Sequence, residues 1–497
     1  MPKPPAPTTW RLCRSGPSKY TGSYSSPVLD GWEELEQFES ALGIEVGQPF
    51  LLRPDGTSDP SISAYFASPT FRRFSRDSQI SYASDIKTYL SFLELQTIDW
   101  REATHDTLLD FEYWRRRDKS NEKRVSGAKF ARELAALGGF YRWQVTRGAV
   151  KTSPVLAIKI CDRRGEERLR TVLRPDNIRS VRVKWLTPRA YRRWRDVGLG
   201  GYTADGVLQE SWRGRNDGRN LAMAELMWSS GLRLREAATL LLPEIPTATG
   251  GEKYVRGRIA TATAKGAGRE YWVSQHALQR MSAYIRTTRA EAVRRAWKAG
   301  RYDNIPDQMF VVEVRPRGRV LLHDKHGRPE ETHLNELDAA ARLHLYRETE
   351  EGLEPVALWL TEAGTPMPYL TWEAVFLNAS QRCAHLGVPI SCHPHMLRHS
   401  FALRMLVTLI HVFDRRLGLT EKERLEYRHL FGDPFVLVQT MLGHAQVATT
   451  RSYYLEPING LQVDMFLNSE ADDNSIQELL SRVARSSPRV QDIAPQS

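Results

Sequence analysis

Apolar side chains recur at helical spacing between residues 60 and 157. The more regular of two periodic sets consists of Phe130, Leu134, Leu137, Tyr141 and Val145. The less regular set consists of Tyr82, Ile86, Tyr89, Leu90 and Phe92. Because a period near 3.6 residues places such side chains on one face of a helix, the pattern predicts a small helical domain over residues 59–157.

Both ends of the chain lack such a sustained pattern. Residues 1–58 are rich in Pro, Ser, Gly and Thr, which favour turns and irregular backbone. We therefore expect a partly ordered N-terminal extension there. Residues 461–497 are mostly polar around one short amphipathic segment, Ile476–Val483, which predicts a C-terminal tail with a short helix.

Helical and alternating patterns mix between these ends, over residues 186–460. Apolar runs predict one helix over Leu221–Leu232, ending at Gly231, and another over Met396–Val412. Alternation around Gly-containing turns predicts two hairpins, Val255–Ala264 with Arg269–Val273 and Phe310–Val314 with Arg319–Leu322. The predicted fold class is mainly α with small β hairpins or a small sheet, in a helical domain followed by a mixed domain.

A basic segment joins the two predicted domains. Between Arg163 and Arg195 there are twelve Lys/Arg and three Asp/Glu residues. A charge run of this kind is as often a solvated face as a binding element. Since it connects two folded segments of a basic protein, we interpret residues 158–185 as a linker that follows a phosphate backbone.

The charge of the whole chain supports an anionic partner. The formal net charge is +11 and the sequence pI is about 9.4. Such an excess favours nucleic acid first and an acidic membrane surface second, and charge alone does not choose between them. No run of about 18 apolar residues is present, so no membrane span is expected.

The N-terminus and the cysteines indicate the compartment. The first ten residues, MPKPPAPTTW, lack the apolar core of a signal peptide. The four cysteines are scattered along the chain at Cys13, Cys161, Cys383 and Cys392. In a chain of this length, scattered cysteines indicate reduced thiols and a cytosolic setting.

The C-terminal quarter carries groups that can grip and break a phosphodiester. It contains His395, Arg398 and His399, then Leu442-Gly443-His444, then Tyr453. Arginine offers a fork of donors to phosphate oxygens, histidine moves a proton near neutral pH, and tyrosine can act as a nucleophile. On a helix, His395 and Arg398 share a face.

Two candidates lie further upstream. Arg233 follows the predicted helix end at Gly231, and Glu236 lies one helical turn on, where it could hold the guanidinium. Such a terminus is most often an ordinary surface salt bridge. Lys265 lies at the tip of the first hairpin, where lysine is usually a solvated turn residue but could also protonate a leaving oxygen. Arg269 is its nearest competitor.

A zinc site is a weaker interpretation of the segment from Cys392 to His399. Cys392, His393, His395 and His399 are of ligand type, but a second closely spaced cysteine pair is missing. Pro394 instead fits the first turn of a helix that carries the histidines.

These motifs, in this order, resemble the tyrosine recombinase family, also called phage-type integrases. The resemblance covers about residues 60–460 and implies a core-binding helical domain and a catalytic domain. It implies that Arg233 and Arg398 clamp the scissile phosphate while Tyr453 attacks phosphorus, leaving a 3′-phosphotyrosyl link and a free 5′-hydroxyl. Tyr453 is preferred to Tyr454 because of its spacing after His444.

The same resemblance implies the remaining roles. Lys265 would protonate the leaving oxygen, His395 would assist proton transfer, and His444 would donate a hydrogen bond to the phosphate. No metal or other cofactor is implied. The implied partners are double-stranded DNA and further copies of the chain in a tetramer, without a membrane, in a cytoplasmic, nucleoid-associated setting.

The chain departs from the compact family pattern in its spacing. About 120 residues separate the Lys265 hairpin from His395, and the stretch from His399 to Leu442 is also long. The insertions fall at about residues 286–356 and 412–437. Two alternatives to a site-specific recombinase stay open, a type IB topoisomerase-like enzyme and a catalytically silent DNA-binding relative.

Overall fold

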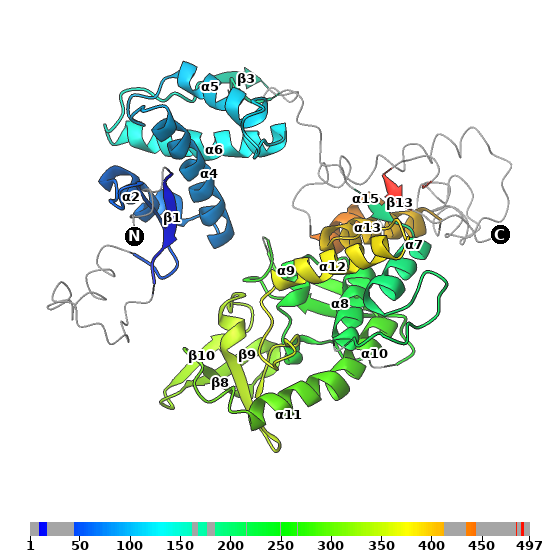
Figure 1. The fold of residues 1–497 in the computed structure, drawn as a ribbon. Helices are drawn as coiled ribbons and strands as arrows, with labels where there is room; N and C mark the ends of the chain where they lie inside the picture. Colours follow the sequence, from blue (N-terminus) through cyan, green and yellow to red (C-terminus); the bar gives the residue numbers. More distant parts are fainter. Residues whose placement is uncertain are drawn as a thin grey trace, which may run out of the picture. The chain divides into compact units, whose positions relative to one another are not determined.

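The chain forms two compact units, Met1–Val181 and Arg182–Ser497, which are described separately (Figure 1). The computed structural model describes residues 9–16, 44–161, 167–175, 184–214, 216–248, 250–265, 267–411, 434–443, 484 and 489–491. The observed class is the predicted one, helical in the first unit and mixed α/β in the second.

The described part of the first unit contains five helices. They are α2 (Pro60–Ala67), α3 (Pro69–Arg72), α4 (Arg76–Leu95), α5 (His105–Arg116) and α6 (Gly127–Thr146). Each follows a Ser, Thr or Asp whose side chain accepts a hydrogen bond from the first turn, which satisfies otherwise unpaired backbone N–H groups. The helices therefore begin where the sequence offers a capping residue.

An aromatic core fills the space between these helices. Eight of the ten residues of the two periodic sets are buried in it, and Tyr82 and Val145 are partly buried against it. Tyr65 and Phe140 meet edge to face, with ring centroids 5.3 Å apart. Such pairs add to the stabilisation that comes from burying their area.

Part of the predicted N-terminal extension packs on this core. Strand β1 (Arg11–Arg14) pairs antiparallel with β2 (Pro49–Leu52). Trp10, just before β1, is buried, and its Nε1 donates to Glu94 Oε2 at 3.2 Å. Strands of four residues are too short to give a visible alternation, so the sequence did not reveal them.

A buried carboxylate joins this strand pair to the helices. Asp59, 1% exposed, accepts hydrogen bonds from Arg53 at 2.7 Å and Arg101 at 3.0 Å. The Arg53 guanidinium lies over Trp10 and that of Arg101 over Trp100. Burial raises the pKa of Asp59, but hydrogen bonds from Trp100 and Arg53 outweigh it and lower the pKa below its usual value.

The segment predicted as a basic linker contains a hairpin at its start. Strand β3 (Ala157–Cys161) pairs antiparallel with β4 (Glu167–Thr171). The sequence Ala-Ile-Lys-Ile-Cys does alternate, but the high charge of the neighbouring residues hid this signal.

The second unit is organised around the buried helix α8 (Asp217–Ser230). Ten residues of α8 are buried. Its Trp228 stacks on Tyr191 of α7 (Pro188–Trp194), with ring centroids 4.1 Å apart and planes 3° from parallel. Helices α9 (Leu234–Ala238), α10 (Gln275–Tyr284) and α13 (Pro394–His411) contact it. The unit also contains α11 (Ala290–Lys298), α12 (Thr371–His385) and α15 (Pro434–Leu442).

The first predicted hairpin is present, with a longer tip than expected. Strand β6 (Tyr254–Ile259) pairs antiparallel with β7 (Arg269–Ser274), and Ile259 lies opposite Arg269. The prediction that the first strand continues to Ala264 was wrong. The backbone N–H of Ala264 donates to the carbonyl of Ala260 at 3.1 Å, so these residues turn rather than pair across the hairpin.

The second predicted hairpin belongs to a larger sheet. Strands β8 (Met309–Val314) and β9 (Arg319–Asp324) pair antiparallel as predicted. They are joined by β10 (Pro329–His333), β11 (Leu345–Thr349) and β12 (Gly352–Pro355) in the order β10-β9-β8-β11-β12. The insertion is therefore a folded five-stranded sheet, whose edge position in the second unit is visible in Figure 1.

Buried arginines hold this sheet to the rest of the second unit. Arg342 donates to the carbonyls of Thr239 and Leu334 and pairs with Glu244 at 2.6 Å. Arg289 donates to three backbone carbonyls of the segment that follows β11, those of Pro355, Ala357 and Leu358. Because each guanidinium can reach several carbonyls at once, one side chain fixes two segments of backbone.

Residues near the C-terminus return to the start of the second unit. Strand β13 (Val490–Gln491) pairs parallel with β5 (Trp185–Leu186). The backbone N–H of Ser391 also donates to Gln491 Oε1 at 3.2 Å. The predicted tail helix, Ile476–Val483, lies outside the described residues.

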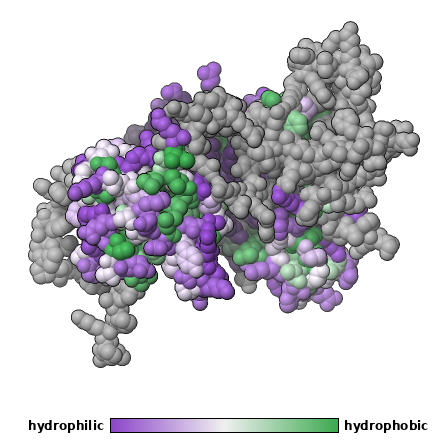
Figure 2. Space-filling view, turned by 90° about the horizontal axis from the view of Figure 1, so that it is seen from above, coloured by the Kyte–Doolittle hydropathy of each residue, from purple (hydrophilic) through white to green (hydrophobic). Residues whose placement is uncertain are grey.

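The described surface is mostly hydrophilic, with smaller apolar patches on the face drawn in Figure 2. Exposed large apolar side chains of the first unit include Leu109, Leu156, Ile158 and Val172. Within the described ranges, no helix is both long enough and apolar enough to cross a membrane.

Candidate functional site

The turn between α8 and α9 presents Arg233. Gly231 ends α8 in the left-handed conformation, with φ of 65°. A Cβ at this position would lie 2.3 Å from the Phe401 ring, so both the backbone and the space require glycine. Arg233 is 21% exposed, and its Nη1 donates to Glu236 Oε1 at 2.9 Å. Glu236 therefore holds the guanidinium, as the spacing predicted.

Glu236 is shared with a second arginine. Arg269 donates from Nη1 to Oε1 and from Nη2 to Oε2, both at 2.7 Å. The backbone N–H of Arg233 also donates to Oε2, at 2.8 Å. The carboxylate thus accepts four hydrogen bonds.

These bonds keep the buried carboxylate ionised. Burial raises the pKa of Glu236, but the hydrogen bonds from Arg269 and the charges of Arg269, Arg398 and Arg233 lower it to about 2. A permanently ionised carboxylate fixes the guanidinium of Arg233 in one place. Its other nitrogen atoms make no hydrogen bond within the described part of the chain.

Arg398 connects this turn to the segment before His444. It lies on α13, is fully buried, and donates to the carbonyl of Gly231 at 2.7 Å and to that of Leu442 at 2.5 Å. These bonds use two of the five guanidinium N–H groups. Segments far apart in the sequence therefore meet at Arg398.

His395 lies one turn before Arg398 on α13. Its side chain is exposed at the surface, and its ring meets that of His399 edge to face, with centroids 4.5 Å apart. Desolvation by the surrounding protein, and then the positive charges of Arg398, His393, Arg233 and Lys265, lower the pKa of His395 to about 4. Its imidazole is therefore neutral at neutral pH and able to accept a proton.

His399 has a packing environment. It is buried, and its ring also meets that of Trp185, with centroids 6.4 Å apart. The His399 ring is therefore part of the packed interior of the second unit.

Lys265 lies in the long tip between β6 and β7. It is exposed and makes no ion pair with any described residue. Its charge is one of those that lower the pKa of His395, which places the two side chains within electrostatic reach. Among the described residues, Lys265 is thus a cation without an ion-pair partner, within electrostatic reach of His395.

A cavity of about 650 Å³ adjoins His395. Its lining combines apolar and polar residues from α9, α12 and the start of α13: Leu234, Glu373, Leu377, Ser380, Ser391, Cys392, His393, Pro394 and His395. The Cys392 thiol in this wall is buried and donates to the carbonyl of His393. Within the described residues, no three His, Cys, Asp or Glu side chains are grouped so that they could hold a metal ion.

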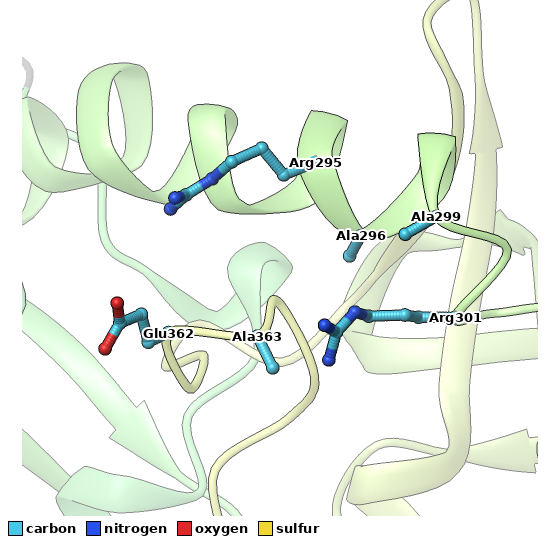
Figure 3. Close-up of a pocket in the computed structure, with 6 residues that line it drawn as sticks. All are labelled: Arg295, Ala296, Ala299, Arg301, Glu362 and Ala363. Carbon is cyan, nitrogen blue, oxygen red and sulfur yellow. The ribbon is translucent and has the colours of Figure 1, made fainter.

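A second cavity, of about 380 Å³, is separate from the predicted residues. Arg295 of α11 and Arg301, which follows that helix, point toward the loop of Glu362 and Ala363 (Figure 3). Both arginines are exposed.

Two of the predicted site residues lie outside the described residues, His444 and Tyr453, and so does Tyr454. The described segment stops just before them. Helix α15 ends at Leu442, and Gly443 follows with φ of 63° and a hydrogen bond from its N–H to the carbonyl of Thr440. The other four predicted residues, Arg233, Lys265, His395 and Arg398, are close enough to influence one another.

The sequence analysis missed the inward position of Arg269. The signal was the alternation along β7, where residues 269, 271 and 273 share one face. Tyr271 and Val273 are fully buried, so Arg269 points to the same side as these core residues. Treating it as a competitor of Lys265 at the hairpin tip overlooked this register.

The fold and the site together define a class: a helical unit followed by a mixed unit in which two arginines, a lysine and a histidine converge. Residues 70–148 match the family model described as the phage integrase N-terminal SAM-like domain. The chain belongs to the tyrosine recombinase (phage-type integrase) family.

Individual relatives are distant. The chain is 22% identical over 382 residues to the tyrosine recombinase XerD of Lacticaseibacillus casei, which covers 77% of this chain and 88% of that protein. It is also 22% identical over 385 residues to the tyrosine recombinase XerC of a Roseiflexus species, and the match covers 77% of this chain and 84% of that protein. Among solved structures, that of the XerH site-specific recombinase bound to a palindromic difH substrate matches with 14% identity and a TM-score of 0.41. This match covers 79% of this chain and 82% of the XerH chain.

Proposed function

We propose that this protein is a site-specific DNA recombinase that breaks and rejoins strands through a covalent 3′-phosphotyrosyl intermediate. The observation that carries the proposal is the convergence at Arg398. This side chain joins the turn that presents Arg233 to the segment that leads to His444, and His395 and Lys265 lie within electrostatic reach.

In the proposed reaction, Arg233 and Arg398 bind the non-bridging oxygens of the scissile phosphate and stabilise the charge that develops there. The hydroxyl of Tyr453 attacks phosphorus, and the bond to the 5′ oxygen breaks. Lys265 gives a proton to that oxygen, while neutral His395 assists proton transfer from the tyrosine. A 5′-hydroxyl from another strand then reverses the step and completes the exchange.

The partners follow from the same proposal. Double-stranded DNA suits the net charge of +11, and exchange between two duplexes requires several copies of the chain, for which we propose a tetramer on DNA. We place this activity in the cytoplasm at the nucleoid.

Trapping the covalent adduct tests this proposal. The protein is incubated in EDTA with a pool of nicked duplexes of randomised sequence, in which cleavage near the nick releases a short strand and prevents rejoining. We expect an adduct on denaturing gels that is lost in Tyr453→Phe and kept in Tyr454→Phe. Loss only in Tyr454→Phe would overturn the assignment of the nucleophile.

Sequencing of the trapped duplexes supplies a defined substrate for a second measurement. Two plasmids that carry the selected sequence are expected to exchange strands. Relaxation of supercoils without exchange would support the topoisomerase-like alternative. DNA binding without any adduct would support the catalytically silent one.

A further inference from the structure

Arg269 joins two predicted parts of the site from a largely buried position. It begins β7, four residues after Lys265, and its side chain is only 10% exposed. Both terminal nitrogen atoms donate to Glu236, which in turn holds Arg233. Because these nitrogen atoms are engaged with a carboxylate, Arg269 is poorly suited to bind a phosphate directly.

The other side of the same arginine packs against the turn at Gly443. A Cβ at position 443 would lie 2.3 Å from Arg269 Cδ and 2.9 Å from Arg269 Nε. Gly443 has φ of 63°, so both the backbone and the neighbouring side chain require glycine. The preceding carbonyl, of Leu442, accepts a hydrogen bond from Arg398. Two arginines from different elements therefore contact one turn.

Together these contacts connect three segments through a single side chain. Arg269 comes from the hairpin that carries Lys265, holds Arg233 through Glu236, and packs under the turn that leads to His444. We propose that Arg269 is a positioning residue, which sets Arg233 and the Leu442–Gly443 turn in register with the hairpin. This inference rests on the proposed strand-breaking function.

The test compares Arg269→Gln and Arg269→Lys with Lys265→Ala on a duplex selected by the wild-type protein. Arg256→Gln is the matched control, because Arg256 lies on the neighbouring strand β6 in an exposed pair with Glu270 at 3.4 Å. The rate of adduct formation in a single turnover is measured on three versions of the scissile group. These are the ordinary phosphate, a methylphosphonate and a 5′-bridging phosphorothiolate.

The modified groups separate arginine function from proton donation. A methylphosphonate lacks one negative oxygen, so it depends less on well-placed arginines. A bridging sulfur leaves without needing a proton, so it depends less on the proton donor. We expect Arg269→Gln to be about 100-fold slower on ordinary phosphate, because small misplacements of binding groups carry costs of that size.

On the methylphosphonate, Arg269→Gln should form the adduct only about 10-fold more slowly than wild type, or less. On the phosphorothiolate, its rate should stay about 100-fold below that of wild type. Lys265→Ala should show the reverse pattern. Arg269→Lys should regain part of the rate, since its ammonium can still reach one carboxylate oxygen. Arg256→Gln should behave as wild type.

Three outcomes would overturn the inference. An equal deficit on all three groups, together with a lower melting temperature, would mean that Arg269 only stabilises the fold. Recovery on the phosphorothiolate would make Arg269 the proton donor. A wild-type rate of adduct formation in Arg269→Gln would mean that Arg269 has no positioning role. Absence of adduct from the wild-type protein on every substrate would instead mean that the proposed function had failed.

Discussion

Two buried carboxylates are held in nearly the same way, one in each unit. Asp59 in the first unit and Glu236 in the second each accept hydrogen bonds from two arginines and from backbone N–H at a helix start. In both, hydrogen bonds and positive charges overcome burial and lower the pKa of the carboxyl group, with Trp100 the first of the donors to Asp59 and Arg269 the first to Glu236. A buried carboxylate with two arginines is therefore not diagnostic of a functional site.

The two clusters differ in the groups that lie next to their arginines. The guanidinium groups of Arg53 and Arg101 lie over Trp10 and Trp100, so each has an aromatic ring against one face, and the cluster serves packing. Arg233 instead faces further positive groups of the candidate site. Like charges are held together at a cost, and this arrangement supports the proposal that they receive an anionic phosphate.

Exchanging an arginine for lysine in each cluster gives the largest expected contrast. Arg233→Lys keeps the charge but loses the planar fork, so adduct formation should fall about 100- to 1000-fold. Arg53→Lys should leave the rate of adduct formation unchanged. Single-turnover cleavage of the same selected duplex measures both. A similar loss in both variants would contradict the division into a structural and a functional cluster.

Removing the charge of Glu236 should show as a loss of stability that depends on pH. The pKa of Glu236 is lowered from 4.5 to about 2. Its contribution to the free energy of unfolding, about 3 kcal/mol, is therefore complete above about pH 4.5 and is lost as the pH falls through about 2. Urea unfolding should show Glu236→Gln less stable than wild type at pH 7, with the gap narrowing towards pH 3.

Asp59→Asn is the matched variant for this measurement. It should also lower stability at pH 7, because the lowered pKa of Asp59 contributes in the same direction. Its folded fraction should cleave DNA at the wild-type rate, whereas that of Glu236→Gln should not. Equal rates of cleavage by the two folded variants would contradict the assignment of Asp59 to a structural cluster and Glu236 to a functional one.

Two left-handed glycines give the smallest contrast. Gly148 follows α6 with φ of 72° and has nothing within 4 Å of an added Cβ, whereas at Gly231 the Cβ would meet Phe401. Gly148→Ala should cost about 1 kcal/mol from backbone strain alone. Gly231→Ala should cost about 2–3 kcal/mol, because overlap is added to strain. Thermal unfolding of the two variants decides whether the extra cost exists.

Much of the fold was predictable from local patterns. The core positions of α4 and α6, the end of α8 at Gly231 and both hairpins followed from periodicity and from turn residues. The pairing of β1 with β2 and the joining of β8 to β11 were not predictable. Those contacts join segments distant in the sequence, so no local pattern indicates which strand pairs with which.

The site was predictable as a set of residue types but not as a network. The spacing from Arg233 to Glu236 indicated their pairing, because both lie within one helical turn. The sharing of Glu236 with Arg269, and the bonds from Arg398 to two carbonyls, arise where separate elements meet. The roles assigned to all six residues, Arg233, Lys265, His395, Arg398, His444 and Tyr453, stay predictions.

The pairing of β13 with β5 has a topological consequence. Residues 490–491 lie one strand spacing, about 4.8 Å, from residues 185–186, so the chain of the second unit begins and returns at one place. The first and last described strands of the unit are therefore neighbours in space. A linker that runs back from residue 491 to residue 185, at the other end of this parallel pair, would give a circular permutant of the second unit with new ends at the exposed turn of residues 325–328.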